Sequence, residues 1–149
     1  MAVTATMPGQ VASKANLANW GTGTYKIALM TSLAAYNQDT TDFWDDLDQD
    51  EVANGNGYTT GGNTLTTFTV SYDAGTNRNR FRATAPAWTS SGAGFSAVGA
   101  VIYEDTAGAA TADPVIVVID FGETLTASNG GTFTITLDAT LGAFYTTAA

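Results

Sequence analysis

The run from Pro114 to Gly122, which reads Pro-Val-Ile-Val-Val-Ile-Asp-Phe-Gly, constrains the fold more than any other stretch of this sequence. It is too short to cross a bilayer, it is rich in β-branched residues, and turn-forming residues bound it. A strand with one face in water alternates polar and apolar residues, whereas Val115 to Ile119 are all apolar. We therefore predict a central strand that is covered on both faces.

The rest of the sequence has the composition of short strands and turns. Charged residues make up only 13% of the 149 residues, and threonine, glycine, alanine and asparagine are abundant, which disfavours long helices. Strand-like apolar patterns occur at 25–30, 95–103 and 133–137, with a last short one near 141–145. We therefore predict an all-β protein, a single-domain β-sandwich or flattened barrel.

The N-terminal part of the chain departs from this pattern. Residues 1–24 carry small and polar side chains without a hydrophobic period, so we expect an extended N-terminal arm before a β domain at residues 25–149. The arm either orders on a partner or is a frayed terminus. It lacks the basic and apolar regions of a secretory signal, and the chain has no cysteine, so we expect assembly in a reducing cytoplasm.

The charge of the chain argues against one group of partners. The formal net charge is −9, from five basic and fourteen acidic residues, and this charge opposes binding to nucleic acid or to an anionic membrane surface. We expect neither as a partner. Histidine and cysteine are both absent from the sequence, so the commonest proton shuttle and metal ligands are missing, and we predict no cofactor.

Half of the acidic residues lie in one short segment, residues 39–51, which contains seven acids and no basic residue. Three apolar residues interrupt the acids at the spacing of one helical edge: Phe43, Trp44 and Leu47. We predict a short acidic helix or turn that lies on the sheet and is capped by Thr41 or Asp42.

The acidic segment also suggests a metal site. Asp46, Asp48 and Asp50 have the spacing that opens a calcium-binding EF-hand loop. The match then fails, because Glu51 stands where that loop needs glycine and Gly57 stands where it needs a bidentate glutamate. An irregular calcium or magnesium site and a solvated or partner-facing acidic surface both stay open, and we assign no metal ligand.

A predicted hairpin carries most of the basic residues. Its first strand is predicted at 64–72, and the side chains expected to point inward are Phe68, Val70 and Tyr72. On the return strand, at 78–85, three of the five basic residues occupy alternate positions and so share one face: Arg78, Arg80 and Arg82.

This arginine stripe brings like charges to within roughly 7 Å of each other, which is unfavourable unless anions face them. The acidic segment at 39–51 is the candidate partner, from the same chain or from a neighbouring copy, through bidentate arginine–carboxylate pairs. The alternative is a solvated outer face of the hairpin, because exposed ion pairs add little stability.

Signatures of catalysis are weak, and we predict that the protein is not an enzyme. Glycoside hydrolysis by two carboxylates is the main catalytic option, but nothing in the sequence fixes the distance between them. The candidate pairs are Asp120 with Glu123 and Glu104 with Asp105. The serines have no histidine to activate them, and neither a G-x-S-x-G nor a P-loop pattern occurs.

The tryptophans leave a binding function open. Trp20, Trp44 and Trp88 could form a platform on which sugar rings stack. In a β protein, however, tryptophans more often pack in the core or at a subunit interface. A carbohydrate- or receptor-binding module is therefore an alternative to a structural role.

Several short motifs together resemble a group of small virion proteins of tailed bacteriophages, identified as head decoration (cement) or minor structural proteins. The resemblance runs from about Tyr25 to Tyr145, and its motifs are turns and strand edges with no chemical signature. They are Tyr25-Lys-Ile-Ala-Leu, Asp42-Phe43, Gly57-Tyr-Thr-Thr-Gly-Gly62, Trp88, Ala100-Val-Ile-Tyr103, the run from Pro114 to Gly122, and Gly131-Thr-Phe-Thr-Ile135.

This resemblance implies a β domain that forms a homo-oligomer, usually a trimer in decoration proteins, on the outside of the major capsid protein lattice. The protein would then belong to the capsid exterior of the virion after assembly in the bacterial cytoplasm. A tail or neck component is an alternative placement. The residues that we predict at interfaces are Arg78, Arg80, Arg82, Asp42, Phe43, Trp44, Asp46 and Trp20.

Overall fold

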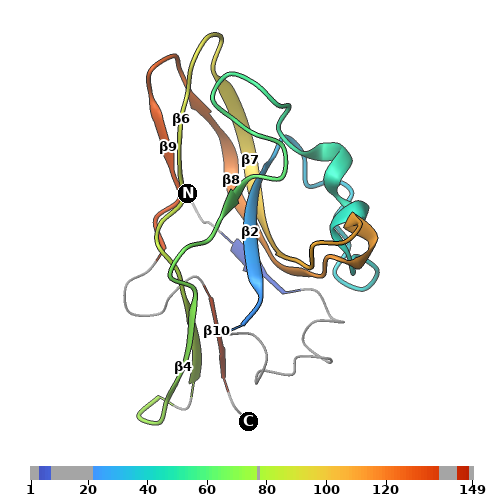
Figure 1. The fold of residues 1–149 in the computed structure, drawn as a ribbon, viewed down its shortest axis with the longest axis vertical. Helices are drawn as coiled ribbons and strands as arrows, with labels where there is room; N and C mark the ends of the chain where they lie inside the picture. The colour runs from blue at the N-terminus through green and yellow to red at the C-terminus, as the bar shows by residue number, and fades with distance from the viewer. Residues whose placement is uncertain (1–3, 8–21, 77, 138–143, 148–149) are drawn as a thin grey trace.

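The computed structural model describes residues 4–7, 22–76, 78–137 and 144–147, and it is mostly β-structure, as predicted. Its strands form several antiparallel sheets, and its helices are short 3-10 turns of three residues each (Figure 1). In the part of the chain that is described, no helix has the length and apolar character needed to span a membrane.

The main sheet has five antiparallel strands. Its order is β1 (Thr4–Thr6), β8 (Val115–Ala127), β7 (Phe95–Asp105), β2 (Thr24–Met30) and β3 (Asn63–Thr64). Long pairings of β7 with both β2 and β8 hold the middle of this sheet together. Most of the described core residues come from these strands.

The strand predicted from the run at 114–122 is β8, and the prediction that both of its faces are covered is confirmed. Val117 and Ile119 belong to the larger hydrophobic cluster on one face of the sheet. Val115 and Val118 belong to a second cluster on the other face, together with Trp44 of the acidic segment. The strand lies inside the sheet, between β1 and β7.

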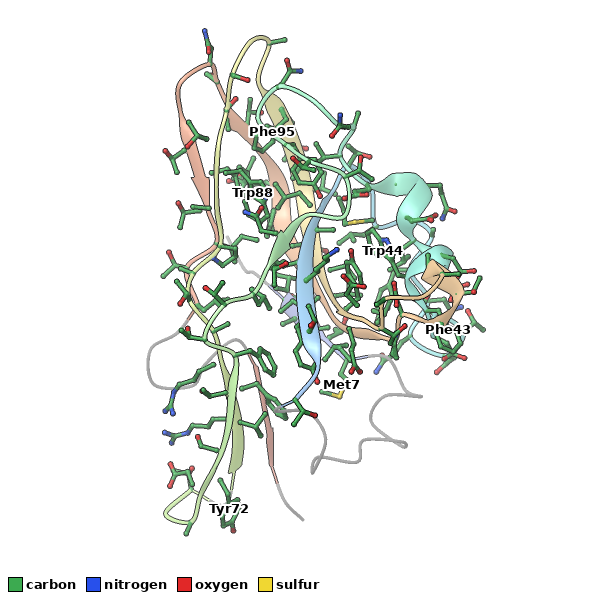
Figure 2. All side chains as sticks on the ribbon, in the orientation of Figure 1. Met7, Phe43, Trp44, Tyr72, Trp88 and Phe95 are labelled. Carbon is green, nitrogen blue, oxygen red and sulfur yellow. The ribbon has the colours of Figure 1, made fainter. Side chains whose placement is uncertain are left out.

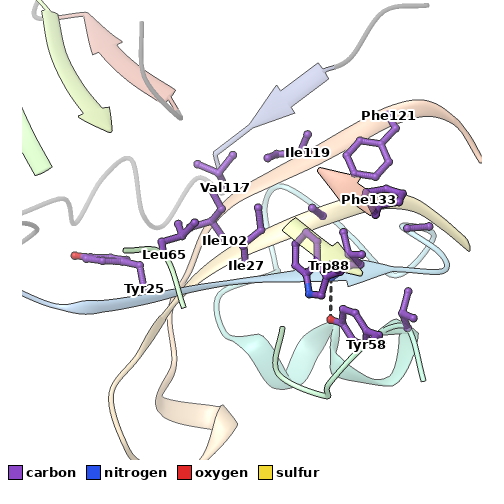
Figure 3. Close-up of a cluster of buried hydrophobic side chains, with 14 of the residues drawn as sticks. Tyr25, Ile27, Tyr58, Leu65, Trp88, Ile102, Val117, Ile119, Phe121 and Phe133 are labelled. Carbon is purple, nitrogen blue, oxygen red and sulfur yellow. Dashed lines mark hydrogen bonds between the residues drawn. The ribbon is translucent and has the colours of Figure 1, made fainter. Parts of the chain in front are cut away.

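A second layer covers the upper half of the main sheet. It consists of β6 (Ala87–Thr89) and β9 (Thr132–Thr134), which pair with each other in an antiparallel manner. Phe133 from this layer packs against Phe95 and Phe121 of the sheet, with ring centroids 5.8 Å and 6.0 Å away. Trp88 of the same layer packs edge-on against Phe133 (Figure 3). The arrangement agrees with the predicted all-β class.

Three strands form a separate sheet that extends past the lower end of the main sheet (Figure 1). Its order is β10 (Phe144–Thr147), β5 (Arg78–Arg82) and β4 (Thr69–Asp73). The predicted hairpin is therefore present as β4 and β5. The first residues of the last predicted strand, 141–143, lie outside the described residues.

The single strand predicted at 64–72 is divided in the structure. β3 pairs with β2 of the main sheet, whereas β4 pairs with β5 of the hairpin sheet. The break contains Thr67, whose φ of 53° lies in the left-handed region and interrupts an extended backbone. Tyr72 was predicted to point inward, but it is 58% exposed because β4 has passed the lower end of the main sheet (Figure 2).

Part of the predicted N-terminal arm belongs to the sheet. Thr4–Thr6 forms the edge strand β1, which pairs with Val118 to Asp120 of β8. Residues 1–3 and 8–21 of the predicted arm lie outside the described residues.

Candidate functional surfaces

We use the name acidic lobe for residues 39–51, which lie over one face of the main sheet (Figure 1). The predicted short helix or turn is present as two 3-10 turns, η1 (Trp44–Asp46) and η2 (Asp48–Asp50). Backbone hydrogen bonds join the lobe to the start of β8: Trp44 N donates to Asp113 O (2.9 Å), and Val115 N donates to Asp42 O (3.0 Å). The lobe is therefore attached to the scaffold by its main chain.

The apolar side chains of the lobe anchor it to the sheet. Leu47 is fully buried, and Trp44 stacks on Tyr103 of β7 with ring centroids 4.6 Å apart and an interplanar angle of 3°. Trp44 itself is only 6% exposed. The ring that was predicted to lie at an interface is thus a packing residue that fixes the lobe on the main sheet.

Phe43 does not share the buried edge that was predicted for it. The residue has extended backbone angles (φ −126°, ψ 164°) and forms an isolated bridge with Pro114. Neighbouring side chains alternate in direction along extended backbone, so burial of Trp44 directs Phe43 outward. Phe43 is 38% exposed and lies at the outer side of the lobe (Figure 2).

The cap of η1 also differs from the prediction. The carboxylate of Asp46 reaches back and accepts hydrogen bonds from the amides of Asp42 (2.9 Å) and Phe43 (3.2 Å). Thr41 is buried, and its hydroxyl accepts from the amide of Asn37 (3.0 Å). The helical turn begins after Phe43, which has no polar side chain, so a carboxylate three residues later satisfies these amides.

The remaining carboxylates of the lobe are not paired with a basic side chain among the described residues. The two ion pairs that the described chain contains are Lys26–Asp105 and Arg80–Asp73, and neither includes the lobe. Among the described residues, no group of three or more potential metal ligands converges, in the lobe or elsewhere. As far as the described residues go, the lobe therefore presents negative charge without a basic partner beside the exposed Phe43 ring.

Glu51, at the end of the lobe, takes part in a partly buried network that the sequence did not indicate. Its Oε1 accepts hydrogen bonds from Tyr58 Oη (2.6 Å) and from Gly61 N (2.7 Å). Tyr58 Oη also accepts from the amide of Leu29 in β2 (3.0 Å). Burial raises the pKa of Glu51 above its usual value, despite these hydrogen bonds. In the sequence Glu51 is one more acid in an acidic run, so no local signal separates it.

We expect Glu51→Gln to remove part of the pH dependence of stability. Because the folded pKa of Glu51 is raised, its contribution to folding stability is fully present below about pH 4.5, the unfolded value, and is lost as the pH rises through the folded pKa. Glutamine keeps an oxygen acceptor for Tyr58 and Gly61 but does not ionise. Urea unfolding from about pH 4 to about pH 8 should therefore show a smaller decline for the variant. Glu123→Gln, on the exposed part of β8, is the control; equal declines in all three proteins would contradict the prediction.

The second charged surface is one face of the β4–β5 hairpin, which we call the arginine face. The strand register places Arg78, Arg80 and Arg82 opposite Asp73, Ser71 and Thr69, respectively. Facing residues in a strand pair lie on the same side of the sheet, so the predicted sharing of one face by the arginines agrees with the register.

Contacts within the hairpin satisfy part of the hydrogen-bonding capacity of these arginines and neutralise part of their positive charge. Arg80 forms an ion pair with Asp73, and Arg82 Nη1 donates to Ser71 Oγ (3.3 Å). The pKa of Asp73 is lowered, first by a hydrogen bond from the Thr76 hydroxyl and then by the amide of Gly75 and the charge of Arg80. The acid that pairs with Arg80 is thus Asp73, which lies diagonally across the hairpin, and not a residue of the acidic lobe.

The structure does not bring the two charged surfaces together within one chain. The acidic lobe lies beside the upper part of the main sheet, and the hairpin extends from its lower end on the other side (Figure 1). The first form of the predicted pairing, between the lobe and the arginine stripe of the same chain, is therefore wrong. The second form, between neighbouring copies, stays a prediction.

Several of the other candidate site residues have structural roles. Trp88 is 3% exposed and packs in the core, and Trp20 lies outside the described residues. Asp120 Oδ1 accepts from the amide of Gly122 (2.8 Å), which holds the turn in β8. Asp105 forms the ion pair with Lys26 (2.8 Å).

Comparisons of the chain with protein families, with curated proteins and with solved structures find no match. The fold and surfaces define an all-β protein with an acidic lobe on one side and an arginine-bearing hairpin on another.

Proposed function

We propose that this chain is a structural protein of a tailed-bacteriophage virion. It acts as a head decoration protein that binds the outside of the major capsid protein lattice and stabilises the head, as a homotrimer. The assignment to the virion rests on the resemblance of the turn and strand motifs described above. A structural role needs no catalytic group and no cofactor, only surfaces that fit other proteins.

One observation carries the structural role: charge of two signs lies on two separate surfaces, and each is attached to the scaffold. The lobe is fixed by the stacked Trp44 and by main-chain bonds to β8, and the hairpin is part of a three-stranded sheet whose middle strand is β5. Preformed surfaces of this kind bind other proteins with little cost in ordering. Several polar side chains that could serve catalysis, including Asp120, Asp105 and Glu51, are engaged in the scaffold.

The carbohydrate-binding alternative has less support. A sugar platform requires tryptophan rings with an open face, and both Trp44 and Trp88 are buried. A tail or neck component is the remaining structural alternative, since the same surfaces could serve there.

The proposal is tested by imaging phage particles with and without this chain. We expect electron cryomicroscopy to show density on the outer face of the head lattice that is lost when the gene is deleted. We also expect the deleted heads to release DNA at a lower temperature. Loss of density only at the neck or tail would favour the alternative placement, and unchanged particles would contradict a virion role. The control is to add the purified protein to heads that lack it. This addition should restore both the outer density and the higher temperature of DNA release.

A further inference from the structure

We propose that the acidic lobe of one copy docks on the arginine face of the hairpin of another copy, with Phe43 as the apolar anchor. The contact is heterologous, because it joins two different surfaces of the same chain. It deepens the proposed function by assigning the surfaces through which copies associate, although it does not depend on capsid binding.

The lobe side of this contact combines charge with an exposed ring. Phe43 and Tyr72 are the large hydrophobic residues that are exposed among those described. Phe43 is surrounded in sequence by Asp42, Asp45 and Asp46, and its backbone is held by the bridge to Pro114. An exposed aromatic ring on a rigid backbone loses little entropy when it is buried by a partner, which is the usual property of an interface anchor.

The hairpin side supplies the complementary chemistry. Residues 69–82 contain three arginines and one acid, in a chain whose net charge is −9. Arg80 and Arg82 are both partly exposed, and the side chain of Arg80 keeps 14% of its surface accessible beside Asp73. A guanidinium carries five N–H donors, so a contact within the hairpin leaves capacity for carboxylates of another molecule. Its planar surface also accepts an aromatic ring such as that of Phe43.

The overall charge selects this orientation over others. Two copies of a strongly acidic protein repel each other in most orientations, and the repulsion falls only where a basic surface faces an acidic one. The lobe and the arginine face lie on different sides of one molecule, so they meet only between molecules (Figure 1). Each copy has one surface of each kind, and a contact of this type closes into a ring or continues as a filament.

The contact is tested by charge reversal on each side. The lobe variant is Asp45→Lys with Asp48→Lys, since no hydrogen bond described for the lobe uses these two carboxylates. The hairpin variant is Arg78→Glu with Arg82→Glu, which leaves the Arg80–Asp73 pair in place. We expect each variant to weaken self-association, measured by sedimentation at about 0.05 M salt, by at least about tenfold.

The combined variant decides whether the two surfaces touch. If they do, the new lysines face the new glutamates, and the combined loss is smaller than the product of the two separate losses. Phe43→Ala should weaken association by about tenfold as well, and salt at about 0.5 M should weaken the contact in the natural protein. Glu123→Lys, which changes a charge on the exposed part of β8, is the control and should have no such effect.

Several results would overturn the inference. The first is sedimentation of the natural protein as a monomer at all concentrations. The second is self-association that charge reversal leaves unchanged. The third is a loss of affinity in the combined variant that equals the product of the two separate losses. Far-UV circular dichroism and urea unfolding show whether each variant folds. If a monomeric protein still decorates heads, the inference and the proposed homotrimer fail, and the decoration role stands. If the protein associates through these surfaces but is absent from heads, the inference stands and the decoration role fails.

Discussion

Gly62→Ala is expected to destabilise the protein by roughly 2–5 kcal/mol, although it adds only one methyl group. A Cβ at this position would lie 2.0 Å from the carbonyl oxygen of Ile27 and 2.7 Å from the Cα of Ala28, both in the backbone of β2. The backbone of a central strand cannot move aside without losing its pairing with β7. The φ of 69° at Gly62 adds the cost of a left-handed conformation, about 1–2 kcal/mol for a residue with a Cβ.

Gly130→Ala is the matched control for this prediction. Gly130 has a similar φ of 77°, but a Cβ there would meet no atom within 4 Å. The control therefore measures the conformational cost alone, and the difference between the two variants measures the close approach to β2. Urea unfolding gives both free energies. Equal losses in the two variants would show that the loop around Gly62 moves away from β2 at little cost.

Trp44→Ala is expected to cost about 3–5 kcal/mol and to release the acidic lobe from the main sheet. The substitution removes the ring that stacks on Tyr103 and leaves a cavity above the smaller hydrophobic cluster, which includes Val118. Hydrogen exchange should show faster exchange across residues 42–50 than in the natural protein.

Phe43→Ala is the matched control for Trp44→Ala, because it removes an aromatic ring from the surface of the lobe and leaves the packing of the lobe on the main sheet intact. Phe43 is adjacent in sequence but 38% exposed, so its loss should change the unfolding free energy by no more than about 0.5 kcal/mol. Equal destabilisation of the two variants would show that Phe43 is buried as deeply as Trp44 in solution, which would contradict the outward orientation of its ring.

The sequence predicted the fold class and the central strand because those features follow from local patterns. An unbroken apolar run such as 115–119 requires cover on both faces, and the structure provides it on β8. The alternation of the arginines also appears as predicted in the register of β5. Residue patterns of this kind do not depend on which strands become neighbours.

The errors arose where a tertiary partner decides the outcome. Phe43 looked like part of a helical edge, but its bridge to Pro114 makes the backbone extended and directs the ring outward. Tyr72 fits an alternating strand, and only the position of β4 beyond the main sheet leaves it exposed. Glu51 is a partly buried acceptor because Tyr58 and Gly61 converge on it from a loop, which no spacing in the sequence reveals.

The pairing of β1 with β8 has a consequence for how the protein folds. Thr4 faces Asp120 across this ladder, so the first described strand finds its partner more than a hundred residues later in the sequence. Arg80 likewise faces Tyr145, near the other end of the chain. Contacts between distant segments slow folding, because the entropy of closing long loops is lost before the contacts form. During synthesis the pairings of β1 with β8 and of β5 with β10 therefore form only after residues 118–120 and 144–147 have been made.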